Sequence, residues 1–246
     1  MKLGFFTDAH YCGAETLCKT RRPVLSLEKI REAMDAFQGE GVDACFCLGD
    51  MTDHAPNETR EQTAAFFGQA LALIRSYEIP FYFVPGNHDY LAMTAQELYE
   101  ALRQEPLPCT VTLGDYMFVL LDANYRSNGK RFDEAGVEWT DSNLPADQLD
   151  FLKTALQSTT KKCVVLIHEN LDPTVEAHHI VKNADEIRTV IRESGKVAAV
   201  LQGHYHPGKV SVTDGIPYIT FPAMCEGTQN SYRILNMDYL QKEFDL

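Results

Sequence analysis

No apolar run in the sequence approaches the roughly 20 residues that a membrane-spanning helix needs. The stretch Met1–Asp8 has neither a long apolar core nor a small-residue cleavage site, so we expect no secretory signal and a cytoplasmic location. Basic residues are also scarce, with 22 Lys and Arg against 35 Asp and Glu and a formal net charge of −13. This deficit argues against partners such as long nucleic acid or a membrane surface, and an anionic substrate would need local positive charge.

Cysteine pairs at redox or metal-binding spacing are lacking as well. The seven cysteines form no C-x-x-C motif. Cys45 and Cys47 would lie on opposite faces of a strand, which prevents them from sharing a metal ion. The pattern indicates reduced and mostly buried thiols.

The composition that remains is that of a globular protein. The 246 residues include 45% hydrophobic and 23% charged residues, enough for a substantial core. We find no repeat, low-complexity segment or linker, so we expect one domain over residues 1–246. The sequence leaves the oligomeric state open.

Apolar strands alternate with amphipathic helices in the first half of the chain, which predicts parallel pairing in an α/β fold. Ser26 and Asn57 are the expected N-caps of the first two helices, and Thr94 with Glu97 forms a capping box before a third. The expected strands are Lys2–Thr7, Ala44–Leu48 and Phe81–Pro85, and the expected long helices are about Ser26–Gln38 and Glu58–Tyr77.

The second half adds two hairpin signals, at Gly114-Asp115 and Asp214-Gly215. The segment Ala123–Leu144 is polar, and we expect it to be a long loop that is functional or mobile. The further expected strands are Thr110–Leu113, Tyr116–Asp122, Cys163–Ile167, Val197–Leu201, Val210–Val212, Ile216–Phe221, Tyr232–Met237 and a short run near Leu246, and the further helices are Ala146–Gln157 and Ala184–Ser194.

Imidazole, carboxylate and amide side chains follow five of the expected strands. The carboxyl ends of strands in an open α/β sheet gather at one edge, where ligands bind. Burying so many polar groups together without a ligand would be costly, so their agreement predicts a metal site. The residues are Asp8 and His10, Asp50, Asn87 and His88, His168, and His204 and His206.

The number of ligands suggests two metal ions. Even seven of these eight residues exceed the needs of one ion, and they suit two ions about 3.5–4 Å apart that share a carboxylate. Asp50, midway in the set, is the natural bridge. The mixture of nitrogen and oxygen donors favours Mn, Fe, Zn, Co or Ni over Ca or Mg alone.

These motifs resemble the calcineurin-like metallophosphoesterases in order and rough spacing. The resemblance covers about Leu3 to His206 and rests on Asp8-Ala9-His10, Gly49-Asp50, Gly86-Asn87-His88-Asp89, His168 and Gly203-His204-Tyr205-His206. It implies an α-β-β-α sandwich of two mixed β-sheets stacked face to face. It also implies two bound metal ions, such as Mn, Fe or Zn.

The resemblance further implies roles for single residues. Asp8, His10, Asp50 and His206 would hold one metal ion, and Asp50, Asn87, His168 and His204 would hold the other. His88 would be a catalytic side chain oriented by Asp89. The expected reaction is hydrolysis of a phosphoester, in which a metal-activated hydroxide attacks phosphorus and His88 assists the leaving oxygen.

The substrate is less clearly indicated. The stretches Gly215–Tyr232 and Arg21-Arg22 look similar to the Mn-dependent ADP-ribose/CDP-alcohol diphosphatase branch, which favours a small phosphodiester or nucleotide diphosphate. Arg21, Arg22 and Tyr11 are candidate substrate contacts, and so are Arg126, Lys130, Arg131, Tyr125 and Trp139, although each could be a solvated loop residue. His54 could support the site, whereas we interpret His178-His179 as a loop or a helix entry.

Three alternatives stay open. One is a phosphomonoesterase, including a protein phosphatase, and another is a nuclease, which the lack of a basic track disfavours. The third is a metal-free scaffold that keeps the fold and binds proteins, which the intact ligand set disfavours.

Overall fold

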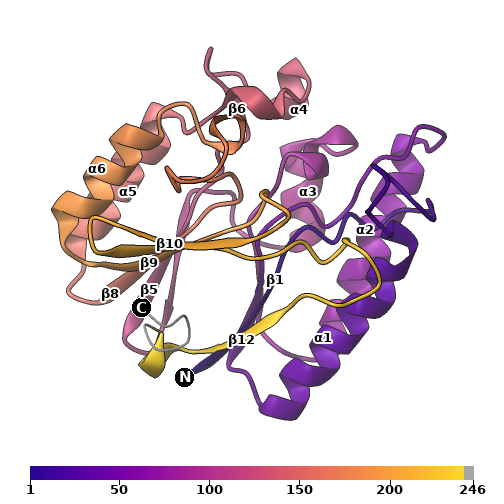
Figure 1. The fold of residues 1–246 in the computed structure, drawn as a ribbon, viewed down its shortest axis with the longest axis horizontal. Coiled ribbons are helices and arrows are strands. Elements are labelled where there is room, and N and C mark those ends of the chain that lie inside the picture. The colour runs from indigo at the N-terminus through magenta and orange to yellow at the C-terminus, as the bar shows by residue number, and fades with distance from the viewer. Residues whose placement is uncertain (241–246) are drawn as a thin grey trace.

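Two mixed β-sheets lie face to face in the computed structural model, which describes residues 1–240. In Figure 1, α1 and α2 cover the outside of one sheet, and α5 and α6 cover the outside of the other. The four-layer α-β-β-α arrangement that the resemblance implied is therefore confirmed.

The smaller sheet has the order β12-β1-β2-β3, in which β1, β2 and β3 are parallel, as expected, and β12 is antiparallel to β1. The larger sheet has the order β10-β11-β9-β8-β5-β4, with four parallel strands between two antiparallel edges. Its edges are the two predicted hairpins. The strands are β1 (Lys2–Phe6), β2 (Ala44–Cys47), β3 (Phe81–Phe83), β4 (Cys109–Leu113), β5 (Tyr116–Leu120), β6 (Tyr125–Arg126), β7 (Ser142–Asn143), β8 (Lys162–Leu166), β9 (Val197–Gln202), β10 (Lys209–Thr213), β11 (Ile216–Thr220) and β12 (Arg233–Asn236).

Six α-helices and five short 3-10 helices occur in the described residues. They are α1 (Ser26–Glu40), α2 (Arg60–Arg75), α3 (Ala95–Leu102), α4 (Phe132–Ala135), α5 (Ala146–Ser158) and α6 (Ala184–Ser194), with η1 (Pro23–Leu25), η2 (His88–Leu91), η3 (Trp139–Asp141), η4 (Ala177–His179) and η5 (Met237–Tyr239). Within residues 1–240, no helix combines the length and the apolar character that a membrane crossing needs.

Two of the three predicted helix caps are wrong. Thr94 forms the expected capping box with Glu97. The box of α2, however, is built by Thr59 and Gln62, two residues beyond the predicted cap Asn57. Ser26 is the first residue of α1, and its hydroxyl donates to the Ala9 carbonyl, so a tertiary contact replaces the local cap.

The capping box of α2 gives a direct test. We expect Thr59→Ala to lower the free energy of unfolding by about 1 kcal/mol, because the Gln62 backbone N–H loses its acceptor. Asn57→Ala is the matched control and should change the free energy of unfolding by less than about 0.5 kcal/mol. Urea denaturation of both variants makes the comparison, and a larger loss for Asn57→Ala would contradict the assignment.

Aromatic side chains fill the space between the two sheets. Phe46 of β2 lies with its ring centroid 5.2 Å from that of Phe5 in β1 and 5.2 Å from that of Phe118 in β5 across the interface. Separate clusters lie under α1–α3 and under α5 and α6. Both faces of the central strands are thus covered, which explains why these strands are apolar almost throughout.

The segment from Ala123 to Leu144 is not the structureless loop that we expected. It contains β6, α4, η3 and β7, and it lies at the top of Figure 1. The Arg126 guanidinium donates to the carbonyls of Ala135 and Gly136, and Arg131 forms an ion pair with Asp133. These two arginines organise the segment itself. The predicted run near Leu246 lies outside the described residues.

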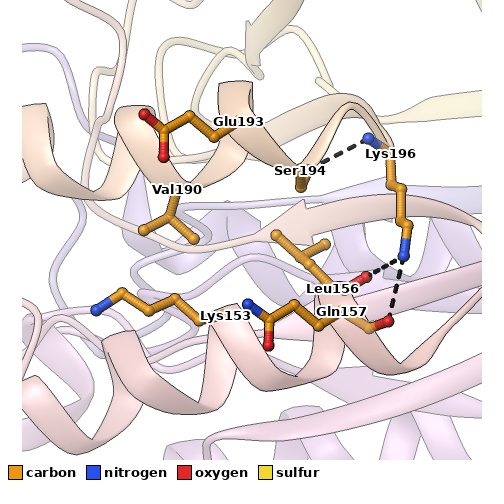
Figure 2. A pocket seen from close by; sticks show the side chains of 7 residues that line it. All are labelled: Lys153, Leu156, Gln157, Val190, Glu193, Ser194 and Lys196. Atoms are coloured by element: carbon orange, nitrogen blue, oxygen red, sulfur yellow. Dashed lines mark hydrogen bonds between the residues drawn. The ribbon is translucent and has the colours of Figure 1, made fainter.

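A groove of about 400 Å³ separates α5 from α6, and Figure 2 shows the side chains that line it. The Lys196 ammonium donates to the carbonyls of Leu156 and Gln157. These carbonyls end α5 without helical partners, so Lys196 caps the helix. None of the candidate site residues predicted from the sequence lines this groove.

Candidate metal centre

The polar residues predicted at the strand ends converge where strands of both sheets have their carboxyl ends. Loops after β1, β2, β3, β8 and β9 deliver them. All of them are buried except His88 and His206, which are partly exposed.

One group contains Asp8, His10, His206 and Asp50. The Nε2 atoms of His10 and His206 lie 3.2 Å apart. Asp8 Oδ1 lies 3.7 Å from His10 Nε2 and 3.4 Å from His206 Nε2. Asp50 Oδ2 lies 3.5 Å from His10 Nε2. Four donor atoms therefore face a common point, as in a metal site.

A second group lies beside the first and contains Asp50, His168 and His204, whose ligand atoms fall within 4.8 Å of one another. Asp50 Oδ2 is 3.3 Å from His168 Nε2. Asp50 also belongs to a group with His10 and His88. Asp50 is thus the carboxylate that the two groups share, in the position of a bridging ligand.

The hydrogen bonds of three imidazoles determine which ring nitrogen faces the centre. His168 Nδ1 donates to the Leu48 carbonyl over 2.6 Å, so its neutral ring has its lone pair on Nε2. The Nδ1 atoms of His10 and His206 face the carboxylates of Asp53 at 3.2 Å and Glu226 at 2.7 Å. Each of these rings therefore presents Nε2 to the centre.

These orientations fit metal ions. Two Nε2 lone pairs, on His10 and His206, would face each other at 3.2 Å, and that of His168 would face a carboxylate. Such contacts repel unless a proton or a cation lies between them. Among the described residues, the buried atoms that lack a hydrogen-bond partner include Asp8 Oδ1, Asn87 Oδ1, His168 Nε2 and His204 Nε2.

The electrostatics of the cluster agree. Burial lowers the pKa of His168, but the facing Asp50 and Asp8 outweigh it and raise that pKa well above its ordinary value. Burial raises the pKa of Asp8, but the neighbouring imidazoles, His168 foremost, lower it well below the usual range. Burial and His168 lower the pKa of His204, which leaves a neutral ring. The buried carboxylates thus carry negative charge that bound cations would balance.

The backbone is strained where it delivers these residues. Asp8, His10, Asp50 and His204 have positive φ angles of 52°, 48°, 52° and 66°. Such a conformation costs on the order of 1 kcal/mol or more for a residue with a Cβ, and it persists where the surroundings enforce it. Four of the nine non-glycine residues with positive φ in the described part of the chain thus lie at the centre.

Gly86 permits close approach of the β3 loop to Asp50. A Cβ on Gly86 would overlap Asp50 Oδ1 and the Asp50 backbone nitrogen. We expect Gly86→Ala to lower metal affinity by about tenfold or more, as displacing an outer support does. Gly68→Ala is the control, because nothing lies within 4 Å of that added methyl group. Metal content after dialysis measures the effect, and wild-type content in Gly86→Ala would contradict it.

The predicted link between Asp89 and His88 is wrong. His88 Nδ1 bonds Asp53 Oδ1 at 2.8 Å instead. The Asp89 carboxylate accepts backbone N–H groups of Asp50 and Gly86, both at 2.9 Å, together with those of Met51 and Thr52. Asp89 therefore joins the β2 and β3 loops, because its short side chain points toward their backbone and away from the imidazole.

Sequence reasoning missed Asp53 and Glu226. Asp53 Oδ1 contacts His88 and Oδ2 contacts His10, so one carboxylate serves two imidazoles. Its position three residues after Asp50, in the same loop, was an available signal. Glu226, which contacts His206 Nδ1, lies 20 residues further along the chain and had no comparable signal.

A pocket of about 680 Å³ opens over the centre. Its lining includes Asp50, Asn87, His88, His204 and His206. Trp139, His178 and His179 also line the pocket, and the ring centroids of His178 and His179 lie 5.4 and 5.3 Å from that of Trp139. The Trp139 ring centroid lies 5.6 Å from that of His204. His178 and His179 belong to η4, as the expected helix entry, but they also face the pocket. Among its described lining residues, Arg21 is the only arginine or lysine.

Other candidates do not line this pocket. The Tyr11 hydroxyl donates to Gln69 Oε1, and its ring packs against Phe66 under α2. Arg22 donates to Thr16 Oγ1 and to the carbonyls of Lys19 and Arg21 within its own loop.

His54, Tyr125 and Cys225 do not line the pocket either. His54 Nδ1 contacts Thr63 Oγ1 in α2, and the Tyr125 ring packs against Arg131. Lys130 is not among the pocket's lining residues. The Cys225 thiol forms a possible ligand group with His10 and His206. It lies 3.9 Å from His206 Nδ1, the ring nitrogen that contacts Glu226 and not the one that faces Asp8 and His10.

Comparison with known proteins agrees with this geometry. A model of the calcineurin-like phosphoesterase family matches residues 1–208. The chain belongs to this family. A search of curated proteins found no match.

Solved structures share the fold of this calcineurin-like phosphoesterase at low sequence identity. A dimetal phosphatase from Danio rerio is 16% identical with a TM-score of 0.78, over 95% of this chain and 91% of that one. The phosphopantetheinyl hydrolase of Mycobacterium tuberculosis is 13% identical with a TM-score of 0.50, over 90% and 89%. GAP50, described as the anchor in the inner membrane complex of Plasmodium, is 11% identical with a TM-score of 0.56, over 94% and 75%.

Proposed function

We propose that this calcineurin-like phosphoesterase is a dinuclear-metal hydrolase of small phosphodiesters or nucleotide diphosphates. The observation that carries the proposal is Asp50, whose carboxylate is common to two clusters of inward-facing donor atoms. Asp8, His10 and His206 would complete one metal site with Asp50. Asn87, His168 and His204 would complete the other. The all-nitrogen-and-oxygen donor set suits Mn, Fe or Zn.

Two bound cations would neutralise the phosphoryl oxygens and make a water molecule acidic enough to attack at neutral pH. His88 faces the same pocket with Nδ1 bonded to Asp53. That bond leaves Nε2 as the nitrogen that can donate a proton to the departing oxygen as the P–O bond breaks. Asp53 keeps the ring in this orientation.

The size of the pocket favours substrates with groups on both sides of the phosphorus. A volume of about 680 Å³ is typical of sites for whole small molecules. A single arginine in the lining suits a small substrate better than a polynucleotide, which would need a basic track. Trp139, whose ring centroid lies 5.6 Å from that of His204, gives the pocket an aromatic surface on which a planar group could pack.

A phosphomonoesterase is the second candidate, because the same donor set would hold a monoester, and the Danio rerio protein with this fold is described as a dimetal phosphatase. A metal-free scaffold is the third, in view of the Plasmodium protein described as an anchor. The intact donor set of this chain argues for catalysis over a scaffold.

A substrate panel with added Mn²⁺ tests the proposal. It contains bis-p-nitrophenyl phosphate, p-nitrophenyl phosphate, ADP-ribose, CDP-choline and a cyclic nucleotide, each assayed also with Asp50→Asn. We expect turnover of the diester or of the diphosphates, lost in the variant. Turnover of the monoester alone would favour the phosphatase. No turnover with any metal, together with no copurified metal, would favour the scaffold.

A further inference from the structure

Arg21 is the one arginine or lysine in the described lining of the pocket. Its guanidinium, however, donates to a carboxylate of the protein, that of Asp53. Arg21 Nη1 lies 3.2 Å from Asp53 Oδ2. The Arg21 side chain is only 18% exposed and that of Asp53 only 7%. The pair is therefore largely shielded from solvent, where an ion pair is stronger than at a free surface.

Asp53 divides its two oxygens among three side chains and the His54 backbone N–H, which donates to Oδ1 over 2.8 Å. Oδ1 contacts His88 Nδ1, whereas Oδ2 contacts His10 Nδ1 and Arg21 Nη1. His10 Nδ1 also lies 3.4 Å from Arg21 Nη1. If His10 uses Nε2 for a metal ion, its Nδ1 carries a proton and cannot accept from Arg21. The guanidinium therefore donates to Asp53 Oδ2.

The loop that carries Arg21 is held in place by backbone bonds on two sides. Arg21 and Leu17 exchange two backbone hydrogen bonds of 3.1 and 3.2 Å. Arg21 also pairs as an antiparallel bridge with Glu226, the residue that contacts His206 Nδ1. The backbone from which Arg21 reaches Asp53 is therefore bonded to the residue that contacts His206.

We propose that Arg21 is a positioning residue that acts on the reaction through Asp53, holding this carboxylate so that it fixes the ring of His88. The proposal rests on the proposed hydrolase function. It assigns to Arg21 a different part from the substrate contact expected from the sequence. A substrate contact would be made directly between the guanidinium and a phosphate.

The kinetic test compares Arg21→Ala with Arg22→Ala. Arg22 is a matched control, because it lies next in the same loop and, within residues 1–240, its guanidinium bonds to Thr16 and to backbone carbonyls. The substrates are aryl phosphodiesters whose leaving groups differ in pKa. We expect Arg21→Ala to lower kcat by about tenfold to a hundredfold for the poorest leaving group, as loss of an outer support does. The loss of kcat should be smaller when p-nitrophenol is the leaving group, because its oxygen needs little protonation as it departs. KM should stay nearly constant.

A double-mutant cycle with His88→Asn adds a second readout. If Arg21 acts through Asp53 and His88, then Arg21→Ala should cost little in the His88→Asn background. Arg21→Lys keeps the charge but not the planar fork, so we expect partial activity. Free guanidinium should partly restore Arg21→Ala. A raised KM with unchanged kcat, or an equal loss for every leaving group that adds fully to His88→Asn, would overturn the proposal.

A spectroscopic readout separates this proposal from the hydrolase function. The His88 Nδ1 proton should give a downfield imidazole resonance that His88→Asn removes, measured on the purified protein with and without Zn²⁺. We expect Arg21→Ala to shift or broaden that resonance and Arg22→Ala to leave it unchanged. An unchanged resonance in Arg21→Ala would overturn the proposal even if no substrate were hydrolysed. A shifted resonance without any turnover would refute the hydrolase function alone.

Discussion

Replacing Asp50 with asparagine is expected to weaken metal binding and to lower kcat strongly. Asp50 Oδ1 accepts the His88 backbone N–H at 2.7 Å, and Oδ2 faces the imidazoles of both donor groups. Only a carboxylate accepts on both sides, because the NH₂ of asparagine would face either the His88 N–H or the metal site. We expect kcat to fall about a thousandfold, since metal ions contribute several kcal/mol and 1.36 kcal/mol corresponds to tenfold.

Metal analysis and steady-state kinetics on the same preparation measure this effect. Asp150→Asn is the control, because that carboxylate is 75% exposed on α5 and pairs with Lys153 of the same helix. It should keep full metal content and a kcat within about twofold of the wild type. An Asp50→Asn protein with both metal ions and a kcat within tenfold of the wild type would show that the bridging assignment is incorrect.

The second large effect is expected for His88→Asn. Loss of a general acid lowers kcat by about 10²–10⁴-fold, and the backbone bond from His88 to Asp50 would remain. Metal content should therefore stay at the wild-type level. His54→Asn is the matched control, because this imidazole contacts Thr63 and does not line the pocket. Kinetics at saturating Mn²⁺ and metal analysis make the comparison.

Metal content decides between two roles for His88, since its ring lies with His10 and Asp50 in a possible ligand group. Loss of one metal ion in His88→Asn would make His88 a ligand and exclude the assigned role. The Asp53→Asn variant should show a similar loss of kcat. The double variant should lose little more, because the two residues act as one unit.

The corrected helix caps show where local sequence is insufficient. Asn57 and Thr59 are both good N-cap residues, two positions apart, and the choice falls to Thr59 because Gln62 completes its capping box. Ser26 also has the chemistry of a cap, but its hydroxyl donates to Ala9, which lies 17 residues earlier in the chain. A hydrogen bond to a distant backbone group leaves no local trace.

The prediction of a long loop over residues 123–144 was wrong for a related reason. Its short strands pair with each other, Arg126 donates to two of its carbonyls and Arg131 bonds to Asp133, so its order comes from polar contacts. Sequence periodicity detects apolar faces, and this segment has few. Trp139 was a candidate stacking residue, but only the fold places it against His178 and His179.

The sequence by itself determined the family, the alternation of strands and helices, and the donor residues of the centre. Polar residues that end apolar strands are visible in a linear chain, because parallel strands bring their carboxyl ends to one edge. Tertiary structure decided what surrounds those donors. Asp53 contacts His88 and His10, Asp89 accepts backbone N–H groups, and the backbone of Arg21 forms a bridge with that of Glu226. Contacts of this kind depend on the angle at which each loop leaves its strand, and the one-dimensional pattern of residues does not contain that angle.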